Sequence, residues 1–157
     1  MANTRMNPLA ELLSVDDILL DIDALSKTRV FEEVGRLFEN HHGFAQALIV
    51  ANLGAREKLG STGLGHGVAI PHARIKGLRR AVAAYVRTRL PIPFDAPDGK
   101  PVSDMLILLV PEHATDEHLQ ILAWSAQIFG DRSFREQLRM CVEARDVRQL
   151  FADWPQS

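Results

Sequence analysis

The chain has 157 residues, of which 46% are hydrophobic and 24% charged, and its formal net charge is −2 at pH 7. This length and composition predict a single domain over residues 1–157 that is large enough to bury a core. Without a basic excess, we expect no nucleic acid to bind. The longest apolar run, Met105–Val110, is too short to cross a bilayer, so no direct membrane insertion is expected.

The chain's first residues and its single cysteine favour a cytoplasmic protein. The opening sequence MANTRMNPLAELL lacks the apolar core of a signal peptide. Cys141 has no partner for an internal disulfide, and we expect it to be a small core or half-buried residue in a reducing compartment. Residues 1–13 are predicted to form a loose arm that leads into the fold.

The first half of the chain predicts one strand and two helices. Ile18–Ile22 is a short apolar run, expected as an edge strand. Ser26 is the expected N-cap of a helix that Gly43 ends. The apolar stripe of this helix comprises Val30, Val34, Leu37 and Phe38, flanked by Phe31. A second helix is expected from Phe44 to about Leu59, with Gly60 as its stop. Its predicted apolar face comprises Phe44, Leu48, Ala51, Ala55 and Leu59.

The middle of the chain predicts two further strands. Residues 81–90 alternate between apolar and polar, as expected of a strand covered on one face. The following PIPFDAPDGKPV is a connection in which Asp98-Gly99 signals a turn. Met105–Val110 is continuously apolar, which is typical of a central strand covered on both faces.

The last third predicts three helices. Thr115 is the expected cap of the first, whose core stripe comprises Leu119, Leu122, Ala126 and Phe129. The sequence SFRE at 133–136 resembles a capping box that opens the second, and a last helix is expected over about Asp146–Asp153. Because helices and strands interleave, the predicted class is α/β, with helices on both faces of a small mixed sheet.

The stretch STGLGHGVAIPHAR, residues 61–74, concentrates glycine, hydroxyl and histidine residues. Its glycines allow backbone N–H groups to face one concavity, a geometry that binds anions. The spacing matches neither a P-loop nor a dinucleotide-binding fingerprint. A purely structural turn and an anion site therefore both remain open.

Pro71 gives His72 a defined setting. The residue before a proline is biased towards extended geometry, so Val68–Ile70 is expected to be a strand. Because proline has no N–H for a ladder, we expect the chain to leave the sheet at His72. Neutral imidazole is a nitrogen nucleophile near neutral pH, and a histidine beside N–H and hydroxyl donors suits a phosphoryl acceptor.

Two other residues are candidates for the same site. Arg56 lies in the last turn of its helix, just before the glycines, and a guanidinium binds phosphate oxygens well. His118 falls in the first turn of the helix after Thr115, where the positive helix end favours the neutral imidazole, which can donate to a phosphoryl oxygen. The alternatives are an exposed cation for Arg56 and a surface histidine for His118.

The remaining histidines suggest less. His41 and His42 close a helix, where cations suit the helix dipole. A zinc site from His66, His72, His113 and His118 is conceivable, but the sequence has no thiolate cluster and no H-E-x-x-H motif, so we predict no metal and no cofactor.

Residues 56–73, REKLGSTGLGHGVAIPHA, resemble the active-site signature of mannitol/fructose-type enzyme IIA proteins of the bacterial phosphoenolpyruvate-dependent phosphotransferase system. DEHLQIL, residues 116–122, is similar to the family's second histidine motif. The resemblance covers about residues 10–153, which are expected to be the core of the domain. PIPFDAPDGKPV, LLVP and the absence of a fused transporter or IIB segment look most like the nitrogen-regulatory branch. The resemblance implies a three-layer α/β/α sandwich.

The resemblance also implies roles. His72 matches the histidine that the family phosphorylates on Nε2, His118 the second active-site histidine, and Arg56 the arginine beside them. The expected phosphoryl-binding residues are Ser61, Thr62, Gly63 and Gly65. His66 departs from the branch, in which a small polar residue such as asparagine is common, and this departure concerns the electrostatics of the pocket.

The implied function is that of a phosphocarrier. It would receive phosphate on His72 from an HPr-like protein and would act on potassium-transport or sensor-kinase proteins according to its phosphorylation state. Three alternatives stay open: a sugar-specific IIA that passes phosphate to a IIB domain, a module that binds an anion or partner without reacting, and a metal-dependent hydrolase.

Overall fold

The structure, a computed structural model, describes residues 8–154. A six-stranded mixed sheet has the order β1-β5-β6-β3-β2, with β4 also paired to β6. The strands are β1 (Ile18–Ile22), β2 (Gly63–Gly65), β3 (Val68–Ala69), β4 (His72–Ile75), β5 (Val82–Ile92) and β6 (Val102–Pro111). The helices are α1 (Pro8–Leu12), α2 (Lys27–His42), α3 (Gln46–Leu59), α4 (Asp116–Phe129), α5 (Arg132–Met140) and α6 (Ala144–Ala152), and a 3-10 turn, η1 (Val15–Asp17), precedes β1.

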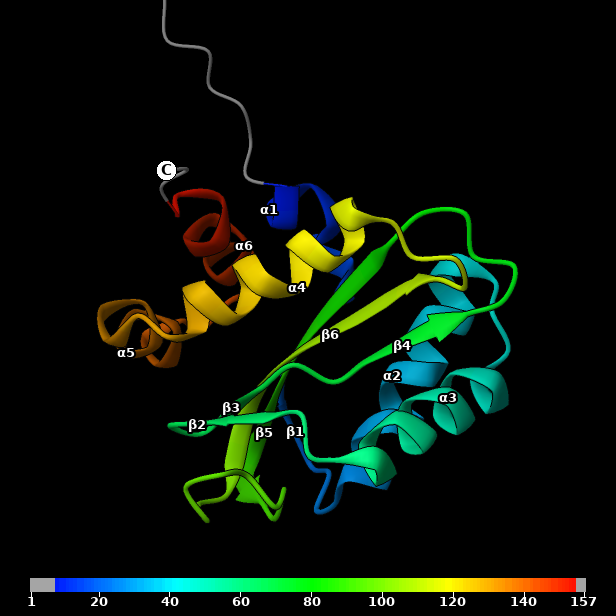
Figure 1. Cartoon of the computed structure of the whole chain (residues 1–157). Coiled ribbons are helices and arrows are strands. Elements are labelled where there is room, and N and C mark those ends of the chain that lie inside the picture. The colour runs from blue at the N-terminus through cyan, green and yellow to red at the C-terminus, as the bar shows by residue number, and fades with distance from the viewer. Residues whose placement is uncertain (1–7, 155–157) are drawn as a thin grey trace, which may run out of the picture.

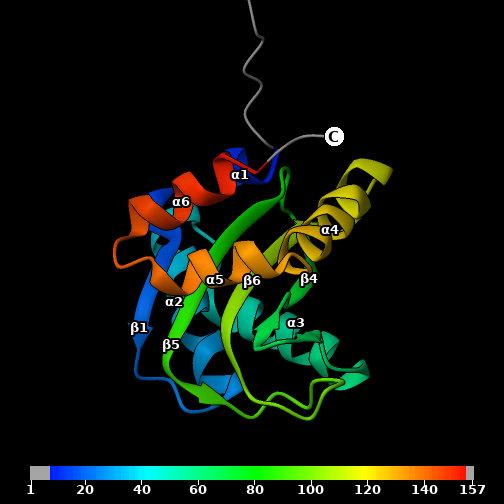
Figure 2. The same cartoon turned by 90° about the vertical axis from the view of Figure 1, so that its left-hand side faces the viewer.

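Helices cover both faces of the sheet, so the fold is the predicted three-layer α/β/α sandwich. The α2–α3 pair packs on one face through a core that includes Val34, Phe38 and Leu53. The other face is covered by α1, α4, α5 and α6, whose core includes Phe129 and Phe151 (Figures 1 and 2). Among residues 8–154, no helix combines the length and apolar character needed to span a bilayer.

The two long antiparallel strands, β5 and β6, lie at the centre of the sheet. The burial of Met105–Val110 on both faces confirms the prediction for β6. The prediction that residues 81–90 are covered on one face only is wrong, because Tyr85 is fully buried against the α6 side and Ala84 and Val86 against the α2 side. The misleading polar position was Arg87, whose side chain is only 12% exposed and pairs with Asp21 at 3.1 Å.

The buried phenol of Tyr85 donates a hydrogen bond to the Asp104 carboxylate. Burial, followed by the negative charge of Asp104, raises the pKa of Tyr85 well above its ordinary value. The buried phenol of Tyr85 therefore has a hydrogen-bond partner inside the core that α1, α4, α5 and α6 cover.

The N-terminal segment is not a loose arm over its whole length. The part in residues 1–7 lies outside the described residues, but Leu9, Ala10 and Leu13 are buried in α1 and just after it. They pack towards α6. A helix of five residues is stable only when tertiary contacts support it, and this packing supplies them. β1 lies at the sheet edge as predicted, paired in parallel with β5.

The ends of α2 agree with the sequence prediction. Ser26 accepts from the Arg29 N–H, and Gly43 ends the helix with φ 78°. His41 and His42 do more than complement the helix dipole, because Nδ1 of the first and Nε2 of the second lie 2.8 Å and 3.0 Å from the buried Asp17 carboxylate.

Three helical details were predicted wrongly. In α4 the buried residues are Ile121, Ser125, Ile128 and Phe129, so only Phe129 of the predicted stripe is fully buried, and Leu119 is 53% exposed. In α3 the buried residues are Ile49 and Leu53, whereas Leu48, Ala51, Ala55 and Leu59 are exposed. Apolar residues occur all round this helix, so the pattern does not choose a face and packing against α2 and β4 does. In α5 the N-cap is Asp131, which accepts from the Phe134 N–H, and not the serine of SFRE.

Candidate functional site

The candidate site forms where β3 and β4 meet. Both strands run parallel to β6, with Ala69 opposite Met105 and His72 opposite Leu108. The expectation that the chain leaves the sheet at His72 is wrong. Pro71 lacks an N–H, but its carbonyl accepts from the Leu108 N–H at 2.9 Å, so the ladder continues across the proline.

His72 is held by its own backbone. Its Nδ1 lies 2.8 Å from the carbonyl oxygen of Ile70, which can only accept a hydrogen bond. Nδ1 therefore carries the proton, and in the neutral ring the lone pair is on Nε2. Because the imidazole is partly exposed, Nε2 is available to a reacting group.

A cavity of about 400 Å³ brings His72 together with Arg56 and His118. The remaining lining comprises Asn52, Ala73, Arg74, Val110, Ala114, Leu119 and Leu122. Arg56 and His72 come from one stretch of the chain, residues 56–73, whereas His118 belongs to the distant helix α4, so the fold brings the two predicted motifs together. Arg74 adds a second, exposed cation to the same wall.

His118 is fixed in one tautomer. The backbone N–H of Thr115, the N-cap of α4, donates to its Nδ1 at 3.0 Å. A nitrogen that accepts carries no proton, so the neutral ring has its proton on Nε2. At Nε2, His118 thus carries a proton that it can donate, whereas His72 carries a lone pair.

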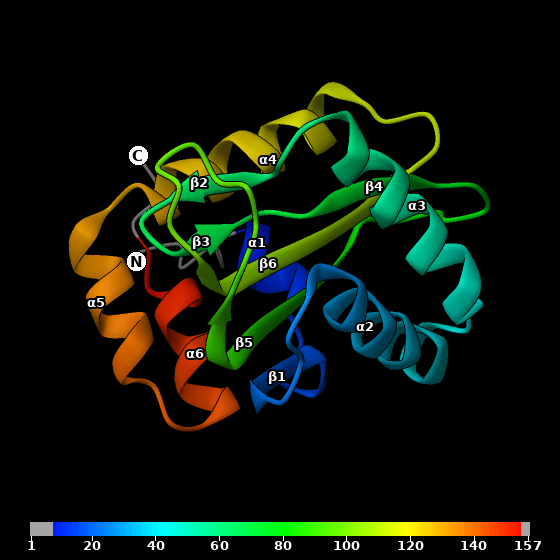
Figure 3. The ribbon, with the colours of Figure 1, turned by 90° about the horizontal axis from the view of Figure 1, so that it is seen from below.

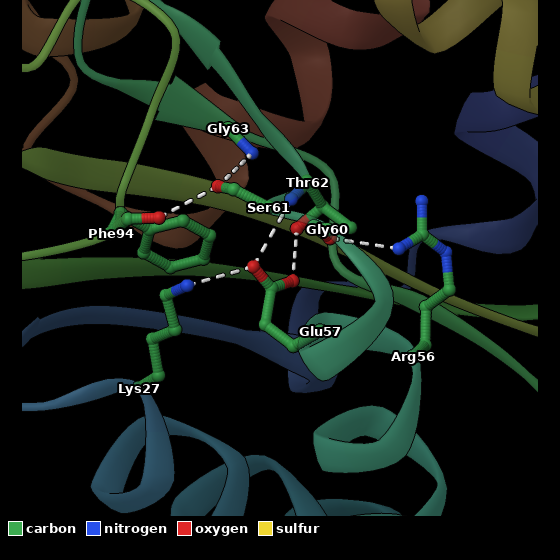
Figure 4. A network of polar contacts seen from close by, with 8 residues as sticks. All are labelled: Lys27, Arg56, Glu57, Gly60, Ser61, Thr62, Gly63 and Phe94. Carbon is green, nitrogen blue, oxygen red and sulfur yellow. Dashed lines mark hydrogen bonds and ion pairs between the residues drawn. The ribbon is translucent and has the colours of Figure 1, made fainter.

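Arg56 is anchored by one of its nitrogens. Its Nη1 donates to the Gly60 carbonyl at 2.8 Å (Figure 4). The other N–H groups have no partner among residues 8–154. A guanidinium held in this way has free donors for an anion in the cavity.

A smaller cavity of about 240 Å³ adjoins the first and also contains Arg56 and His72. Three of the predicted phosphoryl-binding residues, Ser61, Thr62 and Gly63, line it. The structure therefore brings them to His72, although their polar groups are already engaged.

The Glu57 carboxylate organises this segment (Figure 4). Thr62 donates its N–H to Oε2 at 3.1 Å and its hydroxyl to Oε1 at 2.6 Å. Lys27 Nζ lies 2.9 Å from Oε2 and over the Phe94 ring. The Ser61 hydroxyl donates to the Phe94 carbonyl at 2.6 Å and accepts from the Gly63 N–H. Thr62 and Ser61 thus position the loop, and their hydroxyl protons are used inside it.

Gly65 and His66 lie away from His72 and line neither of the two cavities. His66 and Gly67 form the two-residue turn between β2 and β3, with φ of 57° and 79°. Position 66 therefore needs a residue that tolerates the left-handed conformation, as histidine and asparagine do, and its side chain lines neither of the His72 cavities.

The turn is tied to the 93–101 connection. The His66 N–H donates to the Asp98 carboxylate at 2.9 Å, and the Lys100 N–H donates at 3.1 Å. These hydrogen bonds, that of His66 first, lower the pKa of Asp98 below its ordinary value. The predicted turn at Asp98-Gly99 is confirmed, with Gly99 at φ 70°.

Sequence reasoning missed Asn52, Arg74 and Glu57. Arg74 is two residues after His72 in a strand, a spacing that places both side chains on one side. Asn52 lies one helical turn before Arg56, and Glu57 follows it directly. These spacings were visible once His72 and Arg56 had been chosen. Within residues 8–154, no three His, Cys, Asp or Glu residues lie close enough to hold a metal ion.

Comparison with known proteins defines the class of this α/β domain. Residues 11–154 match the family model described as "Phosphoenolpyruvate-dependent sugar phosphotransferase system, EIIA 2". The chain belongs to this family.

Within the family, the chain is similar to nitrogen regulatory proteins. It is 39% identical over 146 residues to the nitrogen regulatory protein of Pseudomonas aeruginosa, covering 92% of this chain and 95% of the relative. The crystal structure of IIA-Ntr from Neisseria meningitidis is 50% identical with a TM-score of 0.88, covering 92% of this chain and 99% of the other. Escherichia coli IIA mannitol, 20% identical with a TM-score of 0.73 over 88% and 98% of the two chains, shares the fold.

Proposed function

We propose that the protein is a phosphocarrier of the nitrogen-regulatory phosphotransferase system that accepts a phosphoryl group on Nε2 of His72. The hydrogen bond from His72 Nδ1 to the Ile70 carbonyl is the observation that carries this proposal. It leaves the nucleophilic lone pair on the ring nitrogen that has no other partner among residues 8–154. Family membership and the similar nitrogen regulatory proteins support the same conclusion.

The proposed donor is the phosphohistidine of an HPr-like protein. The N–P bond of the donor breaks and its electron pair stays on the donor nitrogen, while the Nε2 lone pair of His72 forms the new N–P bond. Such a transfer needs little besides alignment and stabilisation of the charge on the three phosphoryl oxygens. No cofactor takes part in this step.

Arg56 and His118 are proposed to bind those oxygens. The free N–H groups of Arg56 supply positive charge, and the Nε2–H of His118 donates a hydrogen bond. A unit-charge pair about 4 Å apart contributes on the order of 4 kcal/mol at an effective dielectric constant of about 20. Ser61, Thr62 and Gly63 hold the loop that forms the second cavity; Gly65, in the neighbouring hairpin, has no proposed contact with the phosphoryl group.

The phosphorylation state is proposed to be the regulatory output. A phosphoryl group adds a charge of about −1.5 to −2 at pH 7. Leu119 on the rim of the cavity is half exposed, so an apolar or acidic partner surface would bind the unmodified protein and reject the charged form. Potassium-transport and sensor-kinase proteins are the proposed partners of this kind.

Reconstitution tests the proposal. The protein is incubated with phosphoenolpyruvate, enzyme I and an HPr-like carrier, and intact mass is recorded for the wild type, His72→Ala and His113→Ala. His113 is an exposed histidine of the β6–α4 connection and serves as the matched control. We expect one acid-labile phosphoryl group on the wild type and on His113→Ala, and none on His72→Ala.

Two outcomes would favour other functions. If the wild type gains nothing from an active carrier, the cavity binds an anion or partner without reacting. If the phosphorylated protein discharges rapidly to a fructose- or mannitol-type IIB domain, the sugar-specific alternative is correct.

A further inference from the structure

A second cavity of the described residues lies apart from the one at His72. It has a volume of about 630 Å³ and lies between α5, the β2–β3 turn and the connection from β5 to β6. Figure 3 shows this turn pointing towards α5. Its lining comprises His66, Gly67, Pro91, Lys100, Pro101, Ser103, Arg132, Arg135, Glu136 and Arg139. We call it the basic cavity.

The basic cavity concentrates positive charge in a chain whose net charge is negative. Lys100, Arg132, Arg135 and Arg139 line it, and Glu136 is the one carboxylate of the lining. Glu136 is paired with the exposed Arg132 at 3.0 Å. The lining therefore has three more cations than carboxylates.

The Asp98 carboxylate contacts two residues of the lining, His66 and Lys100. It accepts the backbone N–H groups of His66 and Lys100 and interacts with the Lys100 ammonium, but it is not part of the lining. It offsets part of the charge of Lys100 and leaves Arg135 and Arg139 without an ion-pair partner among residues 8–154.

Arg135 is the most informative residue of the basic cavity. It is only 9% exposed, and its Nη1 donates to the Phe129 carbonyl at 2.8 Å. Its remaining N–H groups have no partner, and it forms no ion pair with any of residues 8–154. By contrast, the Arg87 side chain, 12% exposed, pairs with Asp21. A guanidinium that is nine-tenths buried is rarely left without an anion.

Arg139 is a second anchored guanidinium of the basic cavity. Its Nη2 donates to the His66 carbonyl at 2.9 Å, which fixes the guanidinium across the cavity wall without neutralising it. Two anchored guanidinium groups one helical turn apart on α5 present paired N–H donors, the geometry that matches phosphate oxygens. The volume lies within the range of small-molecule sites.

We propose that the basic cavity binds a small phosphate-bearing molecule with more than one negative charge. The ligand reaches Arg135 and Arg139 with one anionic group and Lys100 and Arg132 with another. The site is separate from His72 and does not depend on phosphorylation. It shares the glycine-rich segment with the His72 site, because Gly63 lines one cavity and Gly67 the other.

Calorimetric titration with inorganic pyrophosphate tests the proposal, and orthophosphate is the comparison ligand. The ionic strength is about 0.15 M, at which surface charges are screened. Because Arg135→Met would lose the bond to Phe129, the test uses the double variant Lys100→Gln/Arg132→Gln, whose side chains are exposed. Arg79→Gln/Arg80→Gln removes the same charge from an exposed turn outside the basic cavity and is the matched control.

We expect saturable binding of one pyrophosphate, tighter than that of orthophosphate. The dissociation constant should rise at least about tenfold in Lys100→Gln/Arg132→Gln and less than about twofold in the control. Amide NMR shifts should change at Gly67 and Lys100 and not at His72. Absence of saturable binding, equal weakening in both variants, or shifts centred on His72 would overturn the proposal.

Discussion

Glu57→Gln tests the network that holds the loop beside His72. The carboxylate is 6% exposed and accepts three hydrogen bonds, one from Lys27 and two from Thr62. The variant keeps the size of the side chain but removes its charge, and it places an amide group among donors. The 21% exposed ammonium of Lys27 then has only the Phe94 ring as a partner in the described chain.

The expected cost is about 3 kcal/mol of unfolding free energy. Breaking a buried ion pair by altering one partner costs about 3–5 kcal/mol, and the partial exposure of Lys27 places this case at the lower end. With a denaturant dependence of about 2 kcal/mol per molar urea, the unfolding midpoint should fall by about 1.5 M.

Urea unfolding at pH 7 measures this change, and Glu32→Gln is the matched control. Glu32 pairs with Arg29 on the exposed surface of α2, where such a pair contributes less than about 1 kcal/mol. The cycle with Lys27→Met should give a coupling of at least about 1 kcal/mol. A midpoint shift no larger than that of Glu32→Gln, or additive single effects, would refute the assigned role of the network.

Three further predictions concern the site and its hairpin. His118→Ala should slow phosphoryl transfer about 100-fold with little change in thermal stability. Transfer at the wild-type rate in a rapid-mixing experiment would mean that His118 has a structural role only. Asp98→Asn should lower the unfolding free energy at pH 7 but not at about pH 2. Folding lowers the pKa of this carboxylate, so it stabilises the protein above its unfolded-state pKa and loses that effect as pH falls through the folded-state pKa. Equal losses of unfolding free energy at both pH values would contradict this. Gly63→Ala should lower the unfolding free energy by about 1–3 kcal/mol, because the new Cβ would lie 2.8 Å from the Ala96 Cβ. Gly54→Ala, in open space on α3, should raise the unfolding free energy. Similar urea midpoints for the two variants would be evidence against the close packing at Gly63.

Local patterns predicted most of the fold. The caps Ser26 and Gly43, the edge strand β1 and the buried strand β6 each have a short-range cause, namely a hydrogen-bonding side chain, a left-handed φ or an apolar run. The errors arose where distant packing decides. The buried face of α3 depends on its contacts with α2 and β4, and Tyr85 is covered by helices from the other end of the chain.

The candidate site also has parts that local sequence motifs predict and parts that depend on distant packing. His72, Arg56 and His118 were identified from motifs, and the structure brings them to one cavity. The contribution of Pro71 was misjudged, since only the register with β6 reveals that its carbonyl continues the ladder. The basic cavity could not be predicted, because its cations come from α5 and from a loop more than thirty residues earlier.

The most direct test of the central claim is nitrogen NMR of the His72 ring before and after phosphorylation. In the unmodified protein, the account predicts a neutral ring with the proton on Nδ1, held by the Ile70 carbonyl. After incubation with the phosphorylated carrier, it predicts phosphorus coupling to Nε2 of His72 alone. A proton on Nε2 in the free protein, or a phosphoryl group on Nδ1 or on another residue, would contradict it.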